Sequence, residues 1–251
     1  MTILMRSFQG KTILSFIRNG NYAHAGEEEA ILKVFDGIQK CKNQKILDVG
    51  CGKGGTAKFV QDHGWGSVTG IDVEAESIEF ACTSYPDIKF YCSDVTKVDS
   101  ILSEKYDLIY LFNSFYEFSD QEAALSALRK VAHDKTILII FDYIDLTSGE
   151  GTLIIRNDRT KITNPISLSN FDVFSKKTRW EKISYEDITC NYKEWYQSLL
   201  NSIVQKQDTI TKKFGESGYC SACKRYTDLL NALEQGEMAG GIIKARTIAI
   251  D

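Results

Sequence analysis

The sequence contains little proline, no long hydrophobic run and no excess of basic charge. Only two prolines occur in 251 residues, Pro86 and Pro165, so no proline-rich linker divides the chain. The longest apolar run, Thr136–Phe141, has the length of a strand and is far shorter than the roughly 18 residues of a membrane span. The net charge of −4 gives no electrostatic footprint for nucleic acid. We therefore expect neither a membrane nor a nucleic acid as partner.

The chain also lacks a disulfide pattern and a signal peptide. Its seven cysteines are odd in number, scattered and mostly beside apolar residues, which is typical of reduced, half-buried thiols. The N-terminal apolar stretches are interrupted by Arg6, Gln9 and Lys11, unlike the uninterrupted core of a signal peptide. These features predict a cytoplasmic protein and leave its oligomeric state open.

Short apolar strands alternate with amphipathic helices through the first 145 residues. Strands are predicted at 45–49, 67–71, 88–92, 106–112 and 136–141. Helices are predicted at 27–39, 55–63 and 74–83, and after the capping-box pair Ser119 and Glu122. The last two strands are almost wholly apolar, which is typical of a sheet covered on both faces. The pattern predicts an α/β fold with a Rossmann-like, mostly parallel sheet.

The last hundred residues are less regular. A turn and a short helix are expected at 165–175, a sixth strand at 180–187 and a seventh at 242–250. Between these last two strands, apolar residues at helical spacing predict one helix through Trp195 to Phe214 and another through Tyr219 to Leu233. We therefore expect a seven-stranded sheet with a helical cap inserted before the last strand.

The strongest local signal is the glycine-rich segment after the first strand, residues 47–55, with the sequence LDVGCGKGG. Glycines at such a turn let the backbone approach a ligand, and the next helix directs its N–H groups into the same space. By itself the segment is ambiguous, because Gly50, Gly52 and Gly55 also satisfy the dinucleotide-binding pattern. A glycine-rich turn without a ligand is a further interpretation.

Polar residues end the next three strands. Asp72 ends the second strand, Asp94 follows the third and Asn113 follows the fourth. An open α/β sheet binds its ligand at these carboxyl ends, where Asp72 could accept both hydroxyls of a ribose and Asp94 the amino hydrogens of an adenine. Each aspartate alone could equally be a helix cap, but together they predict one binding site.

The segment Asp48-x-Gly50-x-Gly52-x-Gly54, with Asp72, Asp94 and the sequence YDLIY at 106–110, resembles the motifs of class I S-adenosylmethionine-dependent methyltransferases over about residues 27–145. The resemblance implies S-adenosylmethionine as cofactor and S-adenosylhomocysteine as product. It implies that the methionine portion is held by Asp48, Gly50, Cys51, Gly52, Gly54 and Gly55. It further implies Asp72 on the ribose, Val73 and Val95 against the adenine, Asp94 on its amine, and Asn113 near the sulfonium.

A weaker resemblance covers the C-terminal part. Residues 183–195, the helices that follow and the segment 234–245 (EQGEMAGGIIKA) are similar to N-methyltransferases that act on glycine, sarcosine, dimethylglycine or phosphoethanolamine. This implies a small-molecule acceptor, most simply an amine, and an N-terminal segment with Tyr22 folded over the cofactor. We expect one domain, 1–251, with an N-terminal lid at 1–26, a cofactor-binding core at 27–145 and substrate-side elements at about 150–235. The helical cap is expected at 191–235.

Catalytic candidates follow from position. Tyr116, Glu117, Asp142 and Tyr143 follow strands at the ligand edge, and we rank Tyr116 and Tyr143 first because aromatic rings suit an amine. His24 could arrive from the N-terminal segment. Plain packing is an equal interpretation for the tyrosines. Many relatives carry a histidine after the fourth strand, where this sequence has NSFYEF at 113–118, so no histidine base is expected there.

Other functions are weighed against this one. A nicotinamide-dependent oxidoreductase would fit the glycines and Asp72, but Asp48 before the first glycine and the long prelude argue against it. A methyltransferase-fold protein without turnover, or one that methylates a macromolecule, stays open. No metal is expected: Cys220 and Cys223 have the spacing of half a zinc site but no further ligand nearby, which favours core thiols.

Overall fold

The computed structural model describes residues 2–147 and 162–248. The start of the expected substrate-side segment and the last residues of the expected seventh strand therefore lie outside the described residues. The strands are β1 (Lys45–Val49), β2 (Ser67–Asp72), β3 (Lys89–Cys92), β4 (Tyr106–Phe112), β5 (Ala132–Asp145), β6 (Trp180–Asp187) and β7 (Met238–Thr247). They form one sheet in the order β3-β2-β1-β4-β5-β7-β6.

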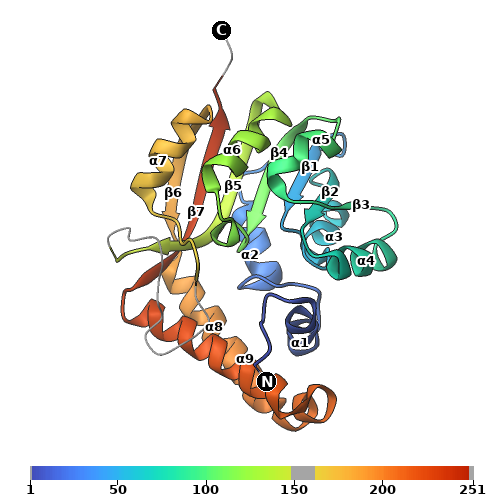
Figure 1. Ribbon diagram of the computed structural model, residues 1–251, viewed down its shortest axis with the longest axis vertical. Helices are drawn as coiled ribbons and strands as arrows, with labels where there is room; N and C mark the ends of the chain where they lie inside the picture. The colour runs from blue at the N-terminus through green and yellow to red at the C-terminus, as the bar shows by residue number, and fades with distance from the viewer. Residues whose placement is uncertain (1, 148–161, 249–251) are drawn as a thin grey trace.

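The direction of the strands confirms the predicted fold class. Neighbours from β3 to β5 pair in parallel, whereas β7 is antiparallel to both β5 and β6 (Figure 1). The carboxyl ends of β1 to β4 therefore meet at one edge of the sheet.

Helices cover both faces of the sheet. They are α1 (Phe8–Arg18), α2 (Glu27–Val34), α3 (Gly55–Asp62), α4 (Ala75–Ser84), α5 (Val98–Ile101), α6 (Gln121–Lys130), α7 (Leu168–Lys177), α8 (Thr189–Gln205) and α9 (Gln207–Glu234). Two short 3₁₀ turns, η1 (Val95–Lys97) and η2 (Phe115–Glu117), follow β3 and β4. Within these described ranges no helix is long and apolar enough to cross a membrane.

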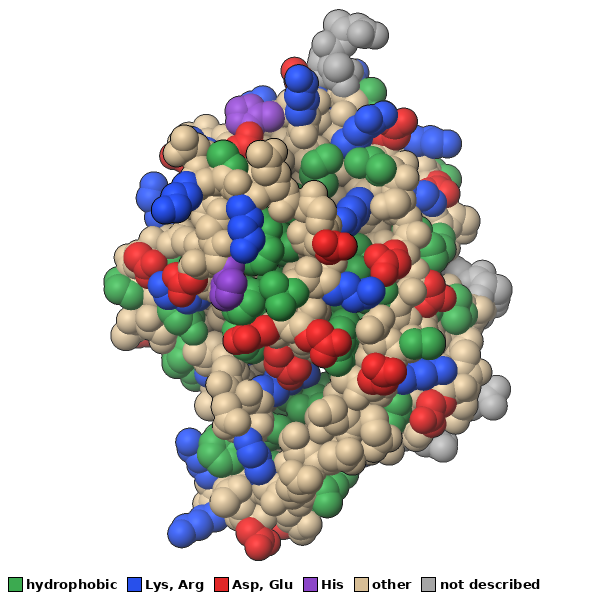
Figure 2. All heavy atoms as spheres, turned by 180° about the vertical axis from the view of Figure 1, so that it is seen from behind, with side chains coloured by type: hydrophobic (Ala, Val, Ile, Leu, Met, Phe, Trp, Pro, Cys, Tyr) green, Lys and Arg blue, Asp and Glu red, His purple; other side chains and the backbone are tan. Residues whose placement is uncertain are grey.

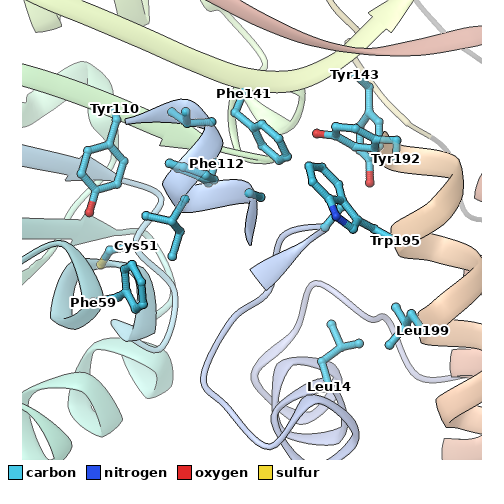
Figure 3. Packing of buried hydrophobic residues seen from close by; sticks show 14 of the residues in the cluster. Leu14, Cys51, Phe59, Tyr110, Phe112, Phe141, Tyr143, Tyr192, Trp195 and Leu199 are labelled. Carbon is cyan, nitrogen blue, oxygen red and sulfur yellow. The ribbon is translucent and has the colours of Figure 1, made fainter. Parts of the chain in front are cut away.

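Alternation along each strand divides the core in two. On β1, Ile46 joins the cluster beneath α2, α3, α4 and α8, whereas Leu47 and Val49 join the cluster beneath α5, α6 and α7. Figure 3 shows the first cluster, where Phe112 and Phe141 of the sheet meet Trp195 of α8. Both faces of the sheet are buried, which explains the nearly continuous apolar character of β4 and β5.

The two helices before β7 are divided at a different residue from the one expected. Helix α8 ends at Gln205, and α9 is kinked at Gly215, which has φ 77° and ψ 167°. The sequence predicted one helix through Phe214, but Lys206 separates α8 from α9. Gly215 allows the kink in α9 because glycine readily adopts a positive φ. In Figure 1 the pair extends from the sheet beside α1, and Leu14 of α1 and Leu199 of α8 belong to the same core.

Three further details correct the sequence-based boundaries. Asp120, not Ser119, caps α6, because its carboxylate accepts the Ala123 N–H at 2.8 Å. Helix α1 was not expected at all. Strand β7 begins at Met238 and not at the expected residue 242, so Gly240 and Gly241 lie within the strand. A Cβ at Gly240 would lie 2.2 Å from the ring of Tyr192, so the close approach of α8 requires glycine there.

Candidate active site

A cavity of about 690 Å³ lies at the carboxyl ends of β1 to β4. Its walls come from the glycine-rich segment, the strand ends, residues 4–24 including part of α1, and helices α8 and α9. Of the predicted site residues, the lining includes Tyr22, His24, Asp48, Gly50, Cys51, Gly52, Asp72, Val73, Asp94, Val95, Asn113, Tyr116 and Tyr143. The fold thus brings site residues that are up to about 120 positions apart in the sequence, from Tyr22 to Tyr143, to one cavity.

The first glycine of the segment allows a tight turn. Gly50 has φ 78°, and a Cβ there would lie 2.4 Å from the Cβ of Ser114. The N–H groups of Gly50 and Cys51 both donate to the carbonyl oxygen of Ile71, at 2.8 and 2.9 Å. The segment is therefore held against β2, and the N–H groups of Gly50 and Cys51 are used in this contact.

Two predicted residues are not brought to the cavity. A Cβ at Gly54 would lie 2.8 Å from the ring of Phe90, and one at Gly55 would lie 2.4 Å from the carbonyl oxygen of Asn21. These glycines allow the start of α3 to pack against β3 and the N-terminal segment. The presence of glycine at these two positions of the motif is thus explained by packing between elements.

Asp48 is a buried carboxyl group at the floor of the cavity. The hydroxyl of Tyr110 donates to it at 3.0 Å. Burial raises the pKa of Asp48 to about 8, the Tyr110 hydrogen bond opposes the rise, and the charge of Asp72 adds to it. Asp48 therefore exchanges a proton near neutral pH.

Asp72 is held at the end of β2 with acceptor capacity to spare. Its carboxylate accepts the N–H of Gly52 at 2.8 Å and that of Glu74 at 2.9 Å. Lys11 of α1 lies 3.7 Å from the same carboxylate and 2.9 Å from the carboxylate of Glu74. An ionised carboxylate offers about four acceptor sites, so two hydroxyls could still be bound.

The next two strand ends supply a matching rim. Val73 is exposed, and Val95 is buried at the start of η1. Asp94 accepts the hydroxyl and the N–H of Thr96, at 2.7 and 2.8 Å, and these hydrogen bonds lower its pKa. Asp94 is thus a cap as well as a cavity residue, and it stays ionised at neutral pH.

Asn113 joins three parts of the chain at the end of β4. Its backbone is left-handed, with φ 46°. Its side-chain oxygen accepts the N–H of Ala25 at 3.2 Å, and its amide nitrogen donates to the hydroxyl of Tyr192 at 2.9 Å. This side chain therefore ties the N-terminal segment and α8 to the edge of the sheet.

The two aromatic residues of the N-terminal segment are already engaged. The hydroxyl of Tyr22 donates to Glu28 at 3.0 Å. The ring nitrogens of His24 contact Thr56 Oγ1 at 3.0 Å and the carbonyl oxygen of Ala25 at 2.9 Å. Burial lowers the pKa of His24 to about 3, so its ring is neutral at physiological pH. Both ring nitrogens of His24 are thus engaged within the protein, at a position that lines the cavity.

The far end of the cavity is rich in tyrosine. The rings of Tyr116 and Tyr143 lie 5.1 Å apart, edge to face, and the hydroxyl of Tyr143 is hydrogen-bonded to that of Tyr196. Burial raises the pKa of both Tyr116 and Tyr143, and the nearby positive charge of Arg225 opposes the rise. These hydroxyls therefore stay protonated at neutral pH.

Several lining residues of this end were missed by sequence reasoning. Tyr196 comes from α8, and Arg225, Tyr226 and Leu229 come from α9. Their only sequence signal is an apolar and aromatic period that equally predicts core packing. Trp195, on the same helix as Tyr196, is buried against Phe141 and Gly26 and is not among the cavity-lining residues.

The cysteine predictions are only partly met. Cys51 is buried, but Cys41, Cys82, Cys92, Cys190 and Cys220 are exposed, contrary to the expected half-buried thiols. Cys220 and Cys223 were expected as core thiols, yet Cys220 faces solvent because it lies on the outer side of α9. In the described part of the chain no cluster of three metal-ligating side chains is found.

Comparison with known proteins identifies a methyltransferase domain within the chain. Residues 46–135 match the family profile described as a methyltransferase domain. This part of the chain is therefore a methyltransferase domain of the S-adenosylmethionine-dependent type. An oxidoreductase is not favoured by any of these findings.

Two curated relatives match part of the chain. A protein of Invertebrate iridescent virus 6 named as methyltransferase 235L is 27% identical over 189 residues, which cover 69% of this chain and 68% of the viral one. An O-methyltransferase of Pyrenophora dematioidea is 30% identical over 123 residues, which cover 47% of this chain and 46% of the fungal one.

A solved structure shares the whole fold. Phosphoethanolamine N-methyltransferase 2 of Haemonchus contortus, in complex with phosphomonomethylethanolamine and S-adenosylhomocysteine, aligns with a TM-score of 0.82 at 17% identity. The alignment covers 99% of this chain and 61% of the nematode enzyme.

The cavity fits the cofactor of the family. Gly50, Cys51 and Gly52 line the cavity with backbone, and Asp72 and Asp94 keep carboxylate oxygens at neighbouring strand ends. A ribose and an adenine need such acceptors, and an open sheet places them at these ends.

Proposed function

We propose that this protein transfers a methyl group from S-adenosylmethionine to a small-molecule acceptor, in the first place an amine. The observation that carries the proposal is a single cavity with strand-end carboxylates at one end and a tyrosine cluster with Arg225 at the other. The cofactor supplies a methyl group on a positively charged sulfur, which an acceptor lone pair attacks in line as the sulfur leaves with the bonding electrons. The chain spans 61% of the nematode enzyme and about half of the fungal one. Because these proteins match only in part, the acceptor proposed here is inferred from the cavity and not from their substrates.

The proposed cofactor contacts follow the strand ends. Asp72 would hold the ribose hydroxyls, and Asp94 the adenine amine, with Val73 and Val95 on the ring. Asp48, Gly50, Cys51 and Gly52 would surround the methionine portion, with Tyr22 above it and Asn113 near the sulfur. Gly54 and Gly55 are omitted, because their positions serve packing.

The contribution of the protein to catalysis is mainly positioning and exclusion of water. Side chains from residues 4–24 and from the helices α8 and α9 line the cavity. Holding two reactants in line supplies on the order of 7–11 kcal/mol of barrier lowering at best. A neutral amine exposes its own lone pair, so a strong base is not required. The faces and edges of Tyr116 and Tyr143 would orient the amine and the ammonium that forms from it.

The charge at the acceptor end points to an acceptor that also carries an anionic group. Arg225 lies among Tyr116, Tyr143, Tyr196 and Tyr226. A guanidinium with surrounding hydroxyl donors suits a carboxylate or a phosphate. The nematode relative is bound to an amine of this kind, phosphomonomethylethanolamine.

An acceptor screen tests the proposal. Purified protein with methyl-labelled cofactor is offered phosphoethanolamine, glycine, sarcosine, dimethylglycine, an uncharged amine of similar size, a small phenol and an RNA pool. Label in one or more anionic amines and none in the uncharged amine supports the proposal. Label only in the phenol would make it an O-methyltransferase, and label only in RNA would overturn the small-molecule assignment.

Two further proposals concern the setting of the enzyme. We propose that residues 1–251 act as one unit, with 1–26 as a lid, 27–145 as the cofactor-binding core and 191–235 as the acceptor cap. A cytoplasmic location is proposed from the cysteine pattern of the sequence. Fractionation of cells that produce the tagged protein tests the location.

A further inference from the structure

Asp142 is a fully buried carboxyl group directly behind the tyrosine end of the cavity. It lies on β5, next to Tyr143, and its side chain has no exposed surface. It does not line the cavity itself. The proposed reaction assigns no role to this carboxyl group. Burying a carboxylate costs several kcal/mol of folding free energy unless its oxygens are hydrogen-bonded.

Three of its hydrogen bonds come from the backbone that carries the cavity tyrosines. One carboxylate oxygen accepts the N–H of Phe115 at 2.8 Å and that of Tyr116 at 3.2 Å. The other accepts the N–H of Tyr143 at 2.8 Å. The same oxygen also accepts a long hydrogen bond, at 3.5 Å, from the side-chain amide of Asn113.

These three N–H groups belong to two separate segments. Phe115 and Tyr116 form the first turn after β4, and Tyr143 lies on β5. One carboxylate therefore joins the two segments at the point where the rings of Tyr116 and Tyr143 meet edge to face. Without it, three buried N–H groups would need new partners, and η2 could rotate relative to β5.

We propose that Asp142 is a positioning residue for methyl transfer, which fixes the turn of Tyr116 against Tyr143 and so sets the two rings that face the acceptor. The inference rests on the proposed function, because it assumes that these rings orient the acceptor. Asp142 contacts neither the acceptor nor the cofactor.

The variant Asp142→Asn tests the proposal, because it keeps the shape but places an amide N–H₂ against N–H donors. We expect kcat to fall about 10- to 100-fold, in line with the cost of a small misplacement of reacting groups. The Kd for S-adenosylhomocysteine should change less than twofold, because Asp142 reaches the cofactor end only through a long hydrogen bond from Asn113, which Ala25 and Tyr192 also hold. Asp145→Asn, three residues further along β5, is the matched control and should keep kcat.

Three outcomes overturn the proposal: an unchanged kcat in the Asn variant, an equal loss in Asp145→Asn, or an equal loss of cofactor binding. The last outcome would make Asp142 a general structural residue. If the wild type transfers no methyl group to any acceptor while it binds S-adenosylhomocysteine, the proposed function fails, and the positioning role fails with it.

The wild-type protein gives a second test that requires no variant to fold. Burial raises the pKa of Asp142 to about 7. The other titratable side chains around it, Tyr116, Tyr143 and Tyr192, have pKa values raised far above this range by burial. The amide resonances of Phe115, Tyr116 and Tyr143 should therefore shift together with one midpoint near pH 7. Three amides that titrate independently, or not at all, would contradict a shared carboxylate.

Discussion

The two ends of the cavity are built in different ways. At the cofactor end, Asp48, Asp72 and Asp94 each follow from the end of a parallel strand, and hydrogen bonds to backbone N–H groups hold Asp72 and Asp94. At the acceptor end, Tyr196 and Arg225 come from two helices that pack on each other and on α1. Backbone geometry therefore defines the first end, and side-chain packing defines the second.

The ends also differ in charge. Carboxylates dominate the cofactor end, where Lys11 pairs with Asp72 and Glu74. Figure 2 shows acidic side chains gathered around a hollow on the face seen from behind. At the acceptor end, Arg225 lies among tyrosine hydroxyls that stay protonated. Cofactor recognition and acceptor recognition should therefore be separable by substitution, and the predictions below test this separation.

The largest effect is expected at the cofactor end from Gly50→Ala. The new Cβ would lie 2.4 Å from the Cβ of Ser114, and φ 78° is unfavourable for alanine. We expect the Kd for S-adenosylhomocysteine, measured by calorimetry, to rise at least about 100-fold, because the segment must move by a substantial part of an ångström.

Gly64→Ala is the matched control for this effect. Gly64 has nearly the same φ, 81°, but a Cβ there meets nothing within 4 Å. It should carry only the conformational cost, about 1 kcal/mol of stability, and leave cofactor binding unchanged. Equal loss of binding in both variants would show that the close approach at Gly50 is unimportant.

A smaller effect, on acceptor binding and not on cofactor binding, is expected at the acceptor end from Arg225→Gln. Loss of a charge-assisted hydrogen bond costs about 1.5–3 kcal/mol, so KM for an anionic amine should rise about 10- to 100-fold. The Kd for S-adenosylhomocysteine should stay within twofold. Lys224→Gln, on the exposed side of the same helix, is the control. A loss of cofactor binding in Arg225→Gln would break the separation of the two ends.

The third effect is a change in the pH dependence of stability in Asp48→Asn. The folded pKa of Asp48, about 8, is above its unfolded value, so the folded state holds the proton more tightly. Its stabilisation is fully present below about pH 4 and is lost as pH rises through 8. Between pH 6 and 8 the wild type should lose up to about 1.4 kcal/mol per pH unit more than the variant. Denaturant unfolding at several pH values measures this, and parallel curves would contradict it.

The smallest effect is expected at the rim of the cavity. Asp120→Ala removes the cap of α6 and should cost about 1 kcal/mol of unfolding free energy. Ser119→Ala, one residue earlier, should cost almost nothing. Thermal unfolding of the two variants separates a rim residue that caps a helix from one that does not, and a larger loss in Ser119→Ala would restore the original capping-box prediction.

The difference between the ends also explains what could be predicted from the sequence. Asp72 and Asp94 could be placed because each follows an apolar strand, and parallel strands bring their carboxyl ends together. The family motifs name the same positions. The mostly parallel seven-stranded sheet was also predicted, whereas the order of its strands comes from the structure.

The acceptor end could not be placed in this way. Tyr196 and Arg225 reach the cavity only through the packing of α8, α9 and α1, and a helical period does not distinguish a cavity wall from a core face. Asp142 gave a strand-end signal, yet only the structure shows that its oxygens accept backbone N–H groups. Gly54 and Gly55 gave a ligand signal that packing explains.

Calorimetric titration with S-adenosylmethionine and S-adenosylhomocysteine tests the central claim most directly, with Asp72→Ala and NADH as controls. We predict micromolar binding of both sulfur compounds, a loss of at least about 10-fold in the variant, and no binding of NADH. Absence of binding to both sulfur compounds, or equal binding in the variant, would contradict a cofactor site at the ends of β1 to β4.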